Sequence, residues 1–343
     1  MTTAGAVTGE PGTATRRSRF SVSGVLQTWG PSLALLVLVL VFSAKSEQFR
    51  TLSNFKGVLD QASVLLILSC GLTFVIVMGA IDLSLEGVMG ACSIAVALLV
   101  ANNQNGNRLG LGGSALALLL GVAFGVLNGL VNTRLRIPSF IATLGTGAIG
   151  IGVATVMFAG KPPHVKDDYF RSIALKRFAT QPFEGLSRVT VLALIVLLVT
   201  FFIQRFTRLG RYAYVIGGGE DIARLSGINV DRYKVGVFAL SGACAGLSGI
   251  VVSARIGQGD VLAGRDQLFA AVTAVVVGGT LLQGGRGGVL HSAVGVLIVS
   301  VLENGMILLD VEPYYQKAVR GLLIVLAVTI TTWPLRGKLR VVK

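Results

Sequence analysis

The sequence predicts an all-α protein, a polytopic bundle of about ten transmembrane helices, some of them broken or short. Hydrophobic residues make up 53% of the 343 residues and charged residues only 13%, about half the charged fraction of a typical soluble domain. The apolar residues form repeated runs close to the ~20 residues that a helix needs to cross a membrane. The chain also contains 45 glycines, and small residues let membrane helices approach one another closely.

Ten apolar segments are expected to be the membrane-spanning helices. They lie at residues 24–43, 58–80, 86–101, 112–133, 138–159, 188–206, 233–254, 267–283, 287–308 and 315–334. The third and eighth are short or rich in glycine, so we expect these helices to be broken or tilted. The first competes with a signal peptide because its most apolar stretch is short, but the many later spans favour an uncleaved helix.

The expected organisation is one transmembrane domain at residues 24–334, with tails at 1–23 and 335–343. An even number of spans places both termini on one side. The basic residues are divided almost evenly between the two sides, but segment 204–234 and the C-terminal tail are compact and basic, which favours the cytoplasmic side for them. Segment 204–234 is then the main cytoplasmic loop, with a short helix expected at residues 220–225 between flanking glycines.

The composition and motifs exclude several classes of protein. The net charge of +14 would suggest nucleic acid in a soluble protein, but here the basic residues flank apolar runs, so the partner is the lipid bilayer. Cys70, Cys92 and Cys244 lie inside apolar runs without metal-ligand spacing. No nucleotide-binding loop, nucleophile elbow or zinc-protease motif is present. We therefore predict no catalytic residue, no metal ligand and no bound cofactor, so energy for transport must come from a partner or an ion gradient.

One polar patch joins the second and third apolar runs with hardly any loop between them. It contains Asp82, Ser84 and Glu86, and an ionisable group in hydrocarbon costs roughly 2.5–3.5 kcal/mol. The patch is either a break inside the membrane that lines a water-filled path or a tight interfacial turn in which Asp82 or Ser84 caps the next helix. The spacing alone leaves both interpretations open, and we keep all three residues as candidates for a substrate pathway.

Other polar residues within the apolar runs are candidates for the same pathway. Glu303 and Asn304 lie well inside the ninth segment, and Asn128 and Thr143 lie in the fourth and fifth. Hydroxyl and amide groups suit a neutral, hydroxyl-rich solute, but they equally often form hydrogen bonds between membrane helices.

The sequence also contains a weak repeat. Residues 75–87 and 275–287 share an apolar run interrupted by glycine and polar residues, as in transporters built from repeats.

Four ordered motifs resemble one family. The segment at 81–84, Ile-Asp-Leu-Ser, resembles the I-D-L-S-V-G-S signature of permeases in the ribose, xylose and galactose class of bacterial ABC importers. Residues 218–230 are similar to the family's cytoplasmic loop, residues 277–287 to its G-G-T…G-G-R-G pattern, and residues 138–145 to its P-P-F-I-V-T-L-G element. The matches extend from about residue 55 to residue 330.

The resemblance implies a permease subunit that imports a monosaccharide or related polyol across the bacterial inner membrane. Its partners would be a second permease subunit, a periplasmic sugar-binding protein and separate ABC ATPase subunits, which use the ATP and Mg²⁺. The ATPase would dock on the cytoplasmic loop, so the coupling residues carried over are Glu220, Ala223, Arg224 and Gly227.

The sequence departs from the family pattern at several positions. Glu86 stands where the family usually has glycine, Ser139 replaces a proline, Ile151 replaces a frequent arginine, and Glu303 replaces a frequent asparagine. The alternative is a proton- or cation-coupled secondary transporter that uses the intramembrane acids Asp82, Glu86 or Glu303. A cytoplasmic ATPase dock would distinguish the two, because a secondary transporter has no need of one.

Overall fold

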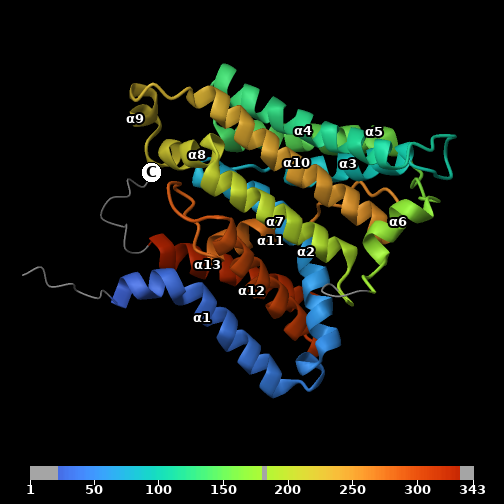
Figure 1. Cartoon of the computed structure of the whole chain (residues 1–343), viewed down its shortest axis with the longest axis horizontal. Helices are drawn as coiled ribbons and strands as arrows, with labels where there is room; N and C mark the ends of the chain where they lie inside the picture. Colours follow the sequence, from blue (N-terminus) through green and yellow to red (C-terminus); the bar gives the residue numbers. More distant parts are fainter. Residues whose placement is uncertain (1–21, 180–183, 333–343) are drawn as a thin grey trace, which may run out of the picture.

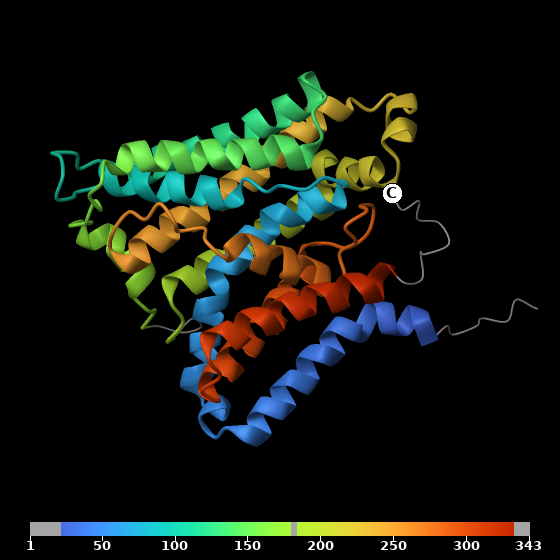
Figure 2. The ribbon, with the colours of Figure 1, turned by 180° about the vertical axis from the view of Figure 1, so that it is seen from behind.

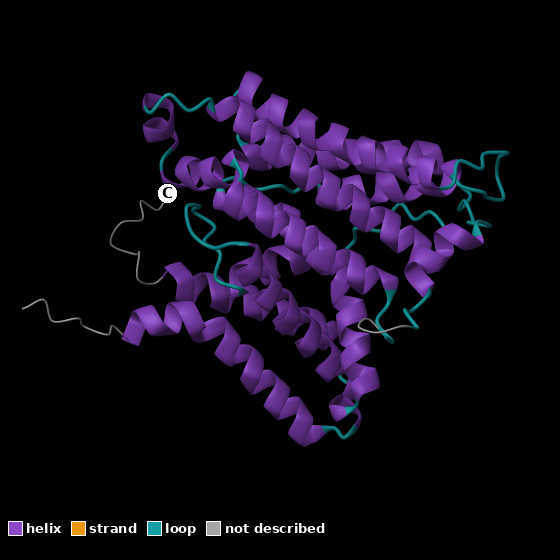
Figure 3. Cartoon of the chain, in the orientation of Figure 1, coloured by secondary structure: helices purple, strands orange, loops and turns teal. Residues whose placement is uncertain are grey.

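The computed structural model describes residues 22–179 and 184–332, and within these ranges the chain is built from helices and loops (Figure 3). Residues 1–21 and 333–343, which hold nearly all of the predicted N-terminal tail and the whole C-terminal tail, lie outside the described residues.

Each of the ten predicted segments contains a helix (Figure 1). These are α1 (Val22–Lys45), α2 (Leu52–Val77), α3 (Leu85–Leu99), α4 (Leu111–Arg134), α5 (Ser139–Phe158), α7 (Arg188–Phe206), α10 (Val230–Ile256), α11 (Gln267–Val277), α12 (Val289–Leu308) and α13 (Pro313–Thr332). Six of them, α2, α4, α5, α7, α10 and α12, are long and apolar enough to cross a membrane. The all-α membrane class is therefore confirmed, while the number of crossings stays a prediction.

Short helices connect the long ones at the two ends of the bundle. They are η1 (Gln48–Arg50), α6 (Asp168–Leu175), α8 (Arg208–Gly218) and α9 (Glu220–Leu225). The last of these coincides with the short helix predicted from the flanking glycines. Hydropathy did not indicate α6 or α8, because each is amphipathic and too polar to stand out as an apolar run.

The third and eighth apolar segments form helices too short to cross a membrane alone, as their composition predicted. α3 has 15 residues and α11 has 11, which gives lengths of about 22 Å and 16 Å against a hydrocarbon core of about 30 Å. Each follows a non-helical stretch, residues 78–84 before α3 and residues 257–266 before α11. Figure 2 shows the extended chain that leads into α3. Both segments are therefore short helices that are unbroken themselves, and each is preceded by a non-helical stretch, which we call an interrupted segment.

α2 and α11 end in the same backbone geometry, 200 residues apart. Ala80 N donates to Val75 O at 3.0 Å, and Thr280 N donates to Val275 O at 3.1 Å. The residue before each donor is a glycine with φ of +80° or +104°, a left-handed conformation that closes many helix C-termini. The similarity between residues 75–87 and 275–287 therefore extends from sequence to hydrogen-bond pattern.

Contacts define two opposite ends of the bundle. At one end, which carries α8 and α9, Gly285 N donates to Val77 O at 2.8 Å and the Tyr214 hydroxyl donates to Gly287 O at 2.7 Å. At the other end, Val165 N donates to Gly257 O at 2.9 Å. The first residues of α1 and the last residues of α13 lie toward the α9 end (Figure 1).

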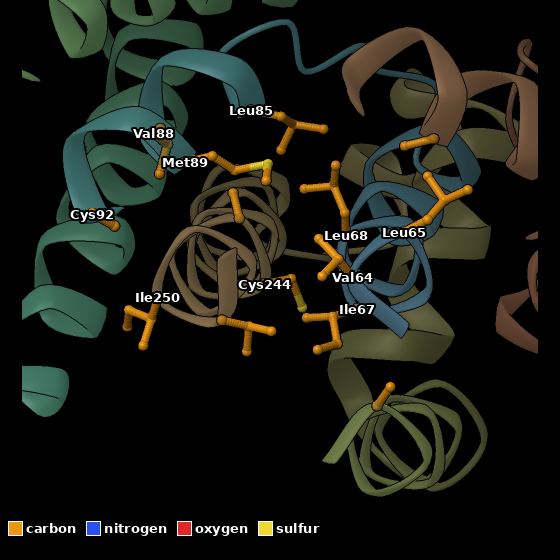
Figure 4. Close-up of a cluster of buried hydrophobic side chains, with 14 of the residues drawn as sticks. Val64, Leu65, Ile67, Leu68, Leu85, Val88, Met89, Cys92, Cys244 and Ile250 are labelled. Carbon is orange, nitrogen blue, oxygen red and sulfur yellow. The ribbon is translucent and has the colours of Figure 1, made fainter. Parts of the chain in front are cut away.

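The hydrophobic core lies between α2, α3 and α10. Figure 4 shows α10 flanked by α2 and α3, with Leu68, Met89 and Cys244 filling the space between them. All three cysteines are free and buried, in keeping with their predicted role as small hydrophobic residues.

α4 and α10 cross in antiparallel contact through glycines. Gly121 and Gly125 on α4 face Gly242 and Gly246 on α10, and a Cβ atom added at Gly125 would collide with the carbonyl group of Phe238. The spacing of four residues aligns these glycines on one face of each helix. The backbones approach too closely for any larger side chain, which fixes α10 against α4.

Candidate functional site

The Asp82 carboxylate is the centre of a buried polar network. Its Oδ1 accepts hydrogen bonds from the backbone N (3.0 Å) and the hydroxyl (2.6 Å) of Ser84, and its Oδ2 accepts one from the Ser241 hydroxyl at 2.7 Å. The Ser84 hydroxyl also accepts from Asn128 Nδ2 at 2.8 Å, and the Thr146 hydroxyl donates to Asn128 Oδ1. Asp82, Ser84, Asn128 and Ser241 are all buried. The network thus joins residues 82–84 to α4, α5 and α10.

Thr143 on α5 also contacts the non-helical segment before α3. Its hydroxyl accepts a hydrogen bond from Leu83 N at 2.9 Å and lies 2.8 Å from Ser139 O on its own helix. A buried non-helical segment must find partners for its backbone groups, and α5 supplies one here. The segment is a non-helical break inside the bundle. Neither Asp82 nor Ser84 caps α3 with its side chain: Asp82 accepts its bonds from Ser84, the residue before the helix, rather than from the first turn of α3.

Glu86 lies one turn further along, in the first turn of α3. It is half-buried, and within the described part of the chain its carboxylate has no hydrogen-bond or ion-pair partner. Gly264, in the interrupted segment before α11, packs so closely on the backbone of Glu86 that a Cβ atom there would collide with it. Glu86 therefore lies where the two interrupted segments meet, and it is an unpaired acid among apolar helices.

Glu303 and Asn304 lie elsewhere, toward the opposite end of the bundle. Glu303 forms an ion pair with Arg320 of α13, and their side chains are 18% and 21% exposed. Asn304 exchanges two hydrogen bonds of 3.0 Å with Asn54, near the start of α2. Since Asn54 and Val77 are separated by about 35 Å along α2, Asn304 lies far from the Asp82 network.

The structure thus separates the predicted pathway residues into two groups. Asp82, Ser84, Asn128 and Thr143 come together with Glu86 nearby, whereas Glu303 and Asn304 bind α13 and α2. Ser241 was missed, because an isolated serine in a glycine-rich apolar helix carries no sequence signal for a partner 159 residues away.

α9 is held on the start of α10 by two ion pairs. Arg224 Nη2 lies 2.7 Å from Asp231 Oδ1, and Lys234 Nζ lies 2.7 Å from Glu220 Oε2. Within α9, Arg224 Nη2 also lies 3.0 Å from Glu220 Oε1. Partial burial alone would raise the pKa of Glu220, but hydrogen bonds and charges from Lys234 and Arg224 outweigh it, so the pKa lies below its ordinary value. The pairs therefore stay charged at neutral pH and are lost only as the pH falls through that lowered pKa.

The two other predicted coupling residues shape the ends of α9. Ala223 is fully buried, which seats the helix on its neighbours. Gly227, with φ of +77°, follows the helix end; its N donates to Arg224 O, and Ile228 N donates to Ala223 O at 3.1 Å. This pair of bonds is the Schellman motif, which a glycine at that position favours.

The outer face of α9 is apolar and exposed. Ile222 is 67% exposed and Leu225 is 89% exposed, and residues three apart lie on the same side of a helix. Beside α9 lies a cavity of about 610 Å³ whose lining residues come from α9, the start of α10 and the turn between α4 and α5. Its charged lining residues are Arg134, Arg136, Glu220, Arg224, Asp231 and Lys234. Ile222 and Leu225 are thus free to contact another protein at this end of the bundle.

Comparisons with known proteins show the family of the chain. A family model described as "Branched-chain amino acid transport system / permease component" matches residues 54–328. The chain belongs to this permease family. It is a transmembrane transport subunit of the ABC importer class rather than an enzyme, and it is a multi-pass protein of the inner membrane.

Three curated relatives of the permease are sugar permeases. The ribose import permease protein of Escherichia coli K12 is 37% identical over 302 residues, covering 87% of this chain and 91% of that protein. The ribose import permease protein of Bacillus subtilis 168 is 32% identical, covering 92% and 96%. The D-allose transport system permease protein of Escherichia coli K12 is 32% identical, covering 92% and 95%. The resemblance stated from the four motifs is thus confirmed. No solved structure matches the chain.

Proposed function

We propose that the permease imports a monosaccharide or related polyol, driven by ATP hydrolysis in a separate ATPase subunit. The substrate class is supported by the curated relatives, which are named for ribose and allose and match along nearly their whole length. The family description refers to branched-chain amino acids, so these relatives carry the narrower assignment.

The observation that most strongly supports an ATPase as the energy source is the exposed helix α9. A six-residue helix with an exposed apolar face, clamped to a long helix by ion pairs, is suited to receive a partner and to move with it. The ATPase docks on Ile222 and Leu225, uses ATP and Mg²⁺, and displaces α9 as it closes and reopens. The basic cavity beside α9 extends this dock toward the turn between α4 and α5.

The remaining partners and the orientation follow from this assignment. The α9 end is cytoplasmic, and the chain crosses the membrane about ten times with both termini on that side. This is supported by the positions of the start of α1 and the end of α13 toward α9 (Figure 1). A periplasmic sugar-binding protein delivers the substrate at the opposite end, and a second permease subunit completes the translocation path.

Within the path, the polar residues divide into two roles. One group hydrogen-bonds internally and to the backbone, and therefore shapes the interrupted segment rather than binding sugar; its members are Asp82, Ser84, Asn128 and Thr143. Glu86 is the candidate for substrate contact, because its carboxylate is unpaired and can accept hydrogen bonds from sugar hydroxyl groups. Glu303 and Asn304 are candidates nearer the outer end.

The secondary-transporter alternative is not favoured. The main ground is the family match over residues 54–328 and the relatives named as ribose and allose permeases. Within the chain, Asp82 accepts three hydrogen bonds and Glu303 is paired with Arg320, so Glu86 is the acid among these three that an ion-coupled carrier would have free within the described residues.

The substrate class is tested by uptake into proteoliposomes that contain the permease, its ATPase and its binding protein. We expect ATP-dependent accumulation of at least one radiolabelled pentose, hexose or polyol, and no accumulation of leucine, isoleucine or valine. Uptake of a branched-chain amino acid with no sugar transported would contradict the proposed substrate class.

A further inference from the structure

We infer that Ser241 is a positioning residue that couples α9 to the interrupted segment at residues 78–84, through its hydrogen bond to Asp82. The inference rests on the proposed function, in which an ATPase moves α9. It adds the route by which that movement reaches the middle of the bundle.

The first step is that α9 and α10 move together. Arg224 and Glu220 of α9 are tied to Asp231 and Lys234 of α10 by ion pairs of 2.7 Å. The turn between the two helices is closed by the Schellman bonds at Gly227 and by the side chain of Asn229, which accepts a hydrogen bond from Arg232 N at 3.1 Å. A displacement of α9 is therefore a displacement of the start of α10.

The second step is that α10 transmits this displacement without a hinge. It is one continuous helix of 27 residues, and Ser241 lies about 16 Å along it from Val230. Ser241 is fully buried, so its hydroxyl is not in contact with water.

The third step is the contact itself. The Ser241 hydroxyl donates to Oδ2 of Asp82 at 2.7 Å, while Oδ1 of the same carboxylate accepts from the backbone N and hydroxyl of Ser84. One carboxylate thus bridges α10 and the residue that precedes α3. Because bonds of this length are directional and all three meet on one buried side chain, a movement of Ser241 is imposed on residues 82–84 and on Glu86, one turn into α3.

Ser248 provides a matched control on the same helix. It is also fully buried, but its hydroxyl donates to a backbone oxygen, Val64 O on α2, at 3.4 Å. The variants Ser241→Ala and Ser248→Ala each remove one buried hydroxyl from α10, and only the first removes the bridge to Asp82.

The test measures sugar uptake and ATP hydrolysis together in proteoliposomes with the ATPase and binding protein. We expect Ser241→Ala to bind the ATPase normally and to hydrolyse ATP, but to transport at least about fivefold less sugar per ATP, the lower end of typical coupling factors between sites. Ser248→Ala should keep the ratio of the unsubstituted permease. Ser241→Cys, which keeps the size of the side chain with a weaker donor, should also lower the ratio, and it provides the test if Ser241→Ala does not accumulate in the membrane.

Each outcome has a distinct meaning. If the sugar transported per ATP is the same in the unsubstituted permease and in the Ser241 and Ser248 variants, the inference is contradicted and the proposed function is not. The same holds if this ratio falls equally in both alanine variants. An unsubstituted permease without ATP-dependent uptake would contradict the proposed function and the inference with it.

Discussion

A permease carrying Leu225→Asp is expected to stay in the membrane in normal amount and to lose its ATPase. Leu225 is 89% exposed on α9, so its replacement breaks almost no contact within the chain. In an assembled transporter it would be buried against the partner, where a carboxylate is costly to desolvate. We expect the affinity for the ATPase to fall at least about 30-fold, the effect of losing about 2 kcal/mol at a central interface residue.

The measurement is co-purification and titration of the ATPase with permease in detergent. The control is Leu109→Asp, an exposed leucine (50%) in the loop before α4, at the opposite end of the bundle, which should bind the ATPase as the unsubstituted chain does. Retention of the unsubstituted affinity by Leu225→Asp would show that α9 is not the dock.

Leu225 is a better choice for this test than Arg224. Arg224 holds both Glu220 and Asp231, and these contacts raise its own pKa, so a charge reversal there would remove one of the two ion pairs between α9 and α10 and place like charges together. Loss of binding in such a variant would not distinguish a missing contact from a displaced helix.

The second large effect is expected from Gly125→Leu, which should prevent α4 from packing on α10. A single Cβ atom at Gly125 already collides with the carbonyl group of Phe238, and overpacking within a tight core commonly costs about 1–3 kcal/mol even for smaller insertions. A backbone contact cannot be relieved by a rotamer change, so we expect a cost at or above that range.

Thermal unfolding and size-exclusion chromatography of the purified permease measure this effect. The control is Gly112→Leu on the same helix, where no atom lies within 4 Å of an added Cβ; it should unfold at the temperature of the unsubstituted chain. A stable, monodisperse Gly125→Leu permease would mean that α4 and α10 do not pack through these glycines.

Much of the fold was predictable because it depends on local properties of the chain. Apolar length located all ten apolar helices, long or short, and glycine punctuation located α9 to the residue. Boundaries were less accurate: α2 begins at Leu52, six residues before the predicted span, because Thr51 caps it by accepting a hydrogen bond from Asn54 N. Hydropathy does not detect a polar first turn of this kind.

The arrangement of the candidate site was less predictable, because it depends on contacts between residues far apart in the sequence. Asp82 was singled out by its charge in an apolar context, but nothing local indicated Ser241 or Thr146 as neighbours. Polarity alone also placed Glu303 and Asn304 with Asp82, whereas they bind Arg320 and Asn54 toward the other end of α2. The sequence therefore indicates which residues are polar within the membrane helices, and only the structure shows that they lie in two separate places.

In the proposed function, a separate ATPase docked at α9 drives import. The most direct measurement is sugar uptake by the reconstituted permease under two energy sources: ATP with the ATPase and binding protein, and an imposed proton or sodium gradient with the permease alone. We expect accumulation only with ATP and both partners, and none under either gradient. Accumulation driven by an ion gradient in the absence of the ATPase would contradict the proposed function.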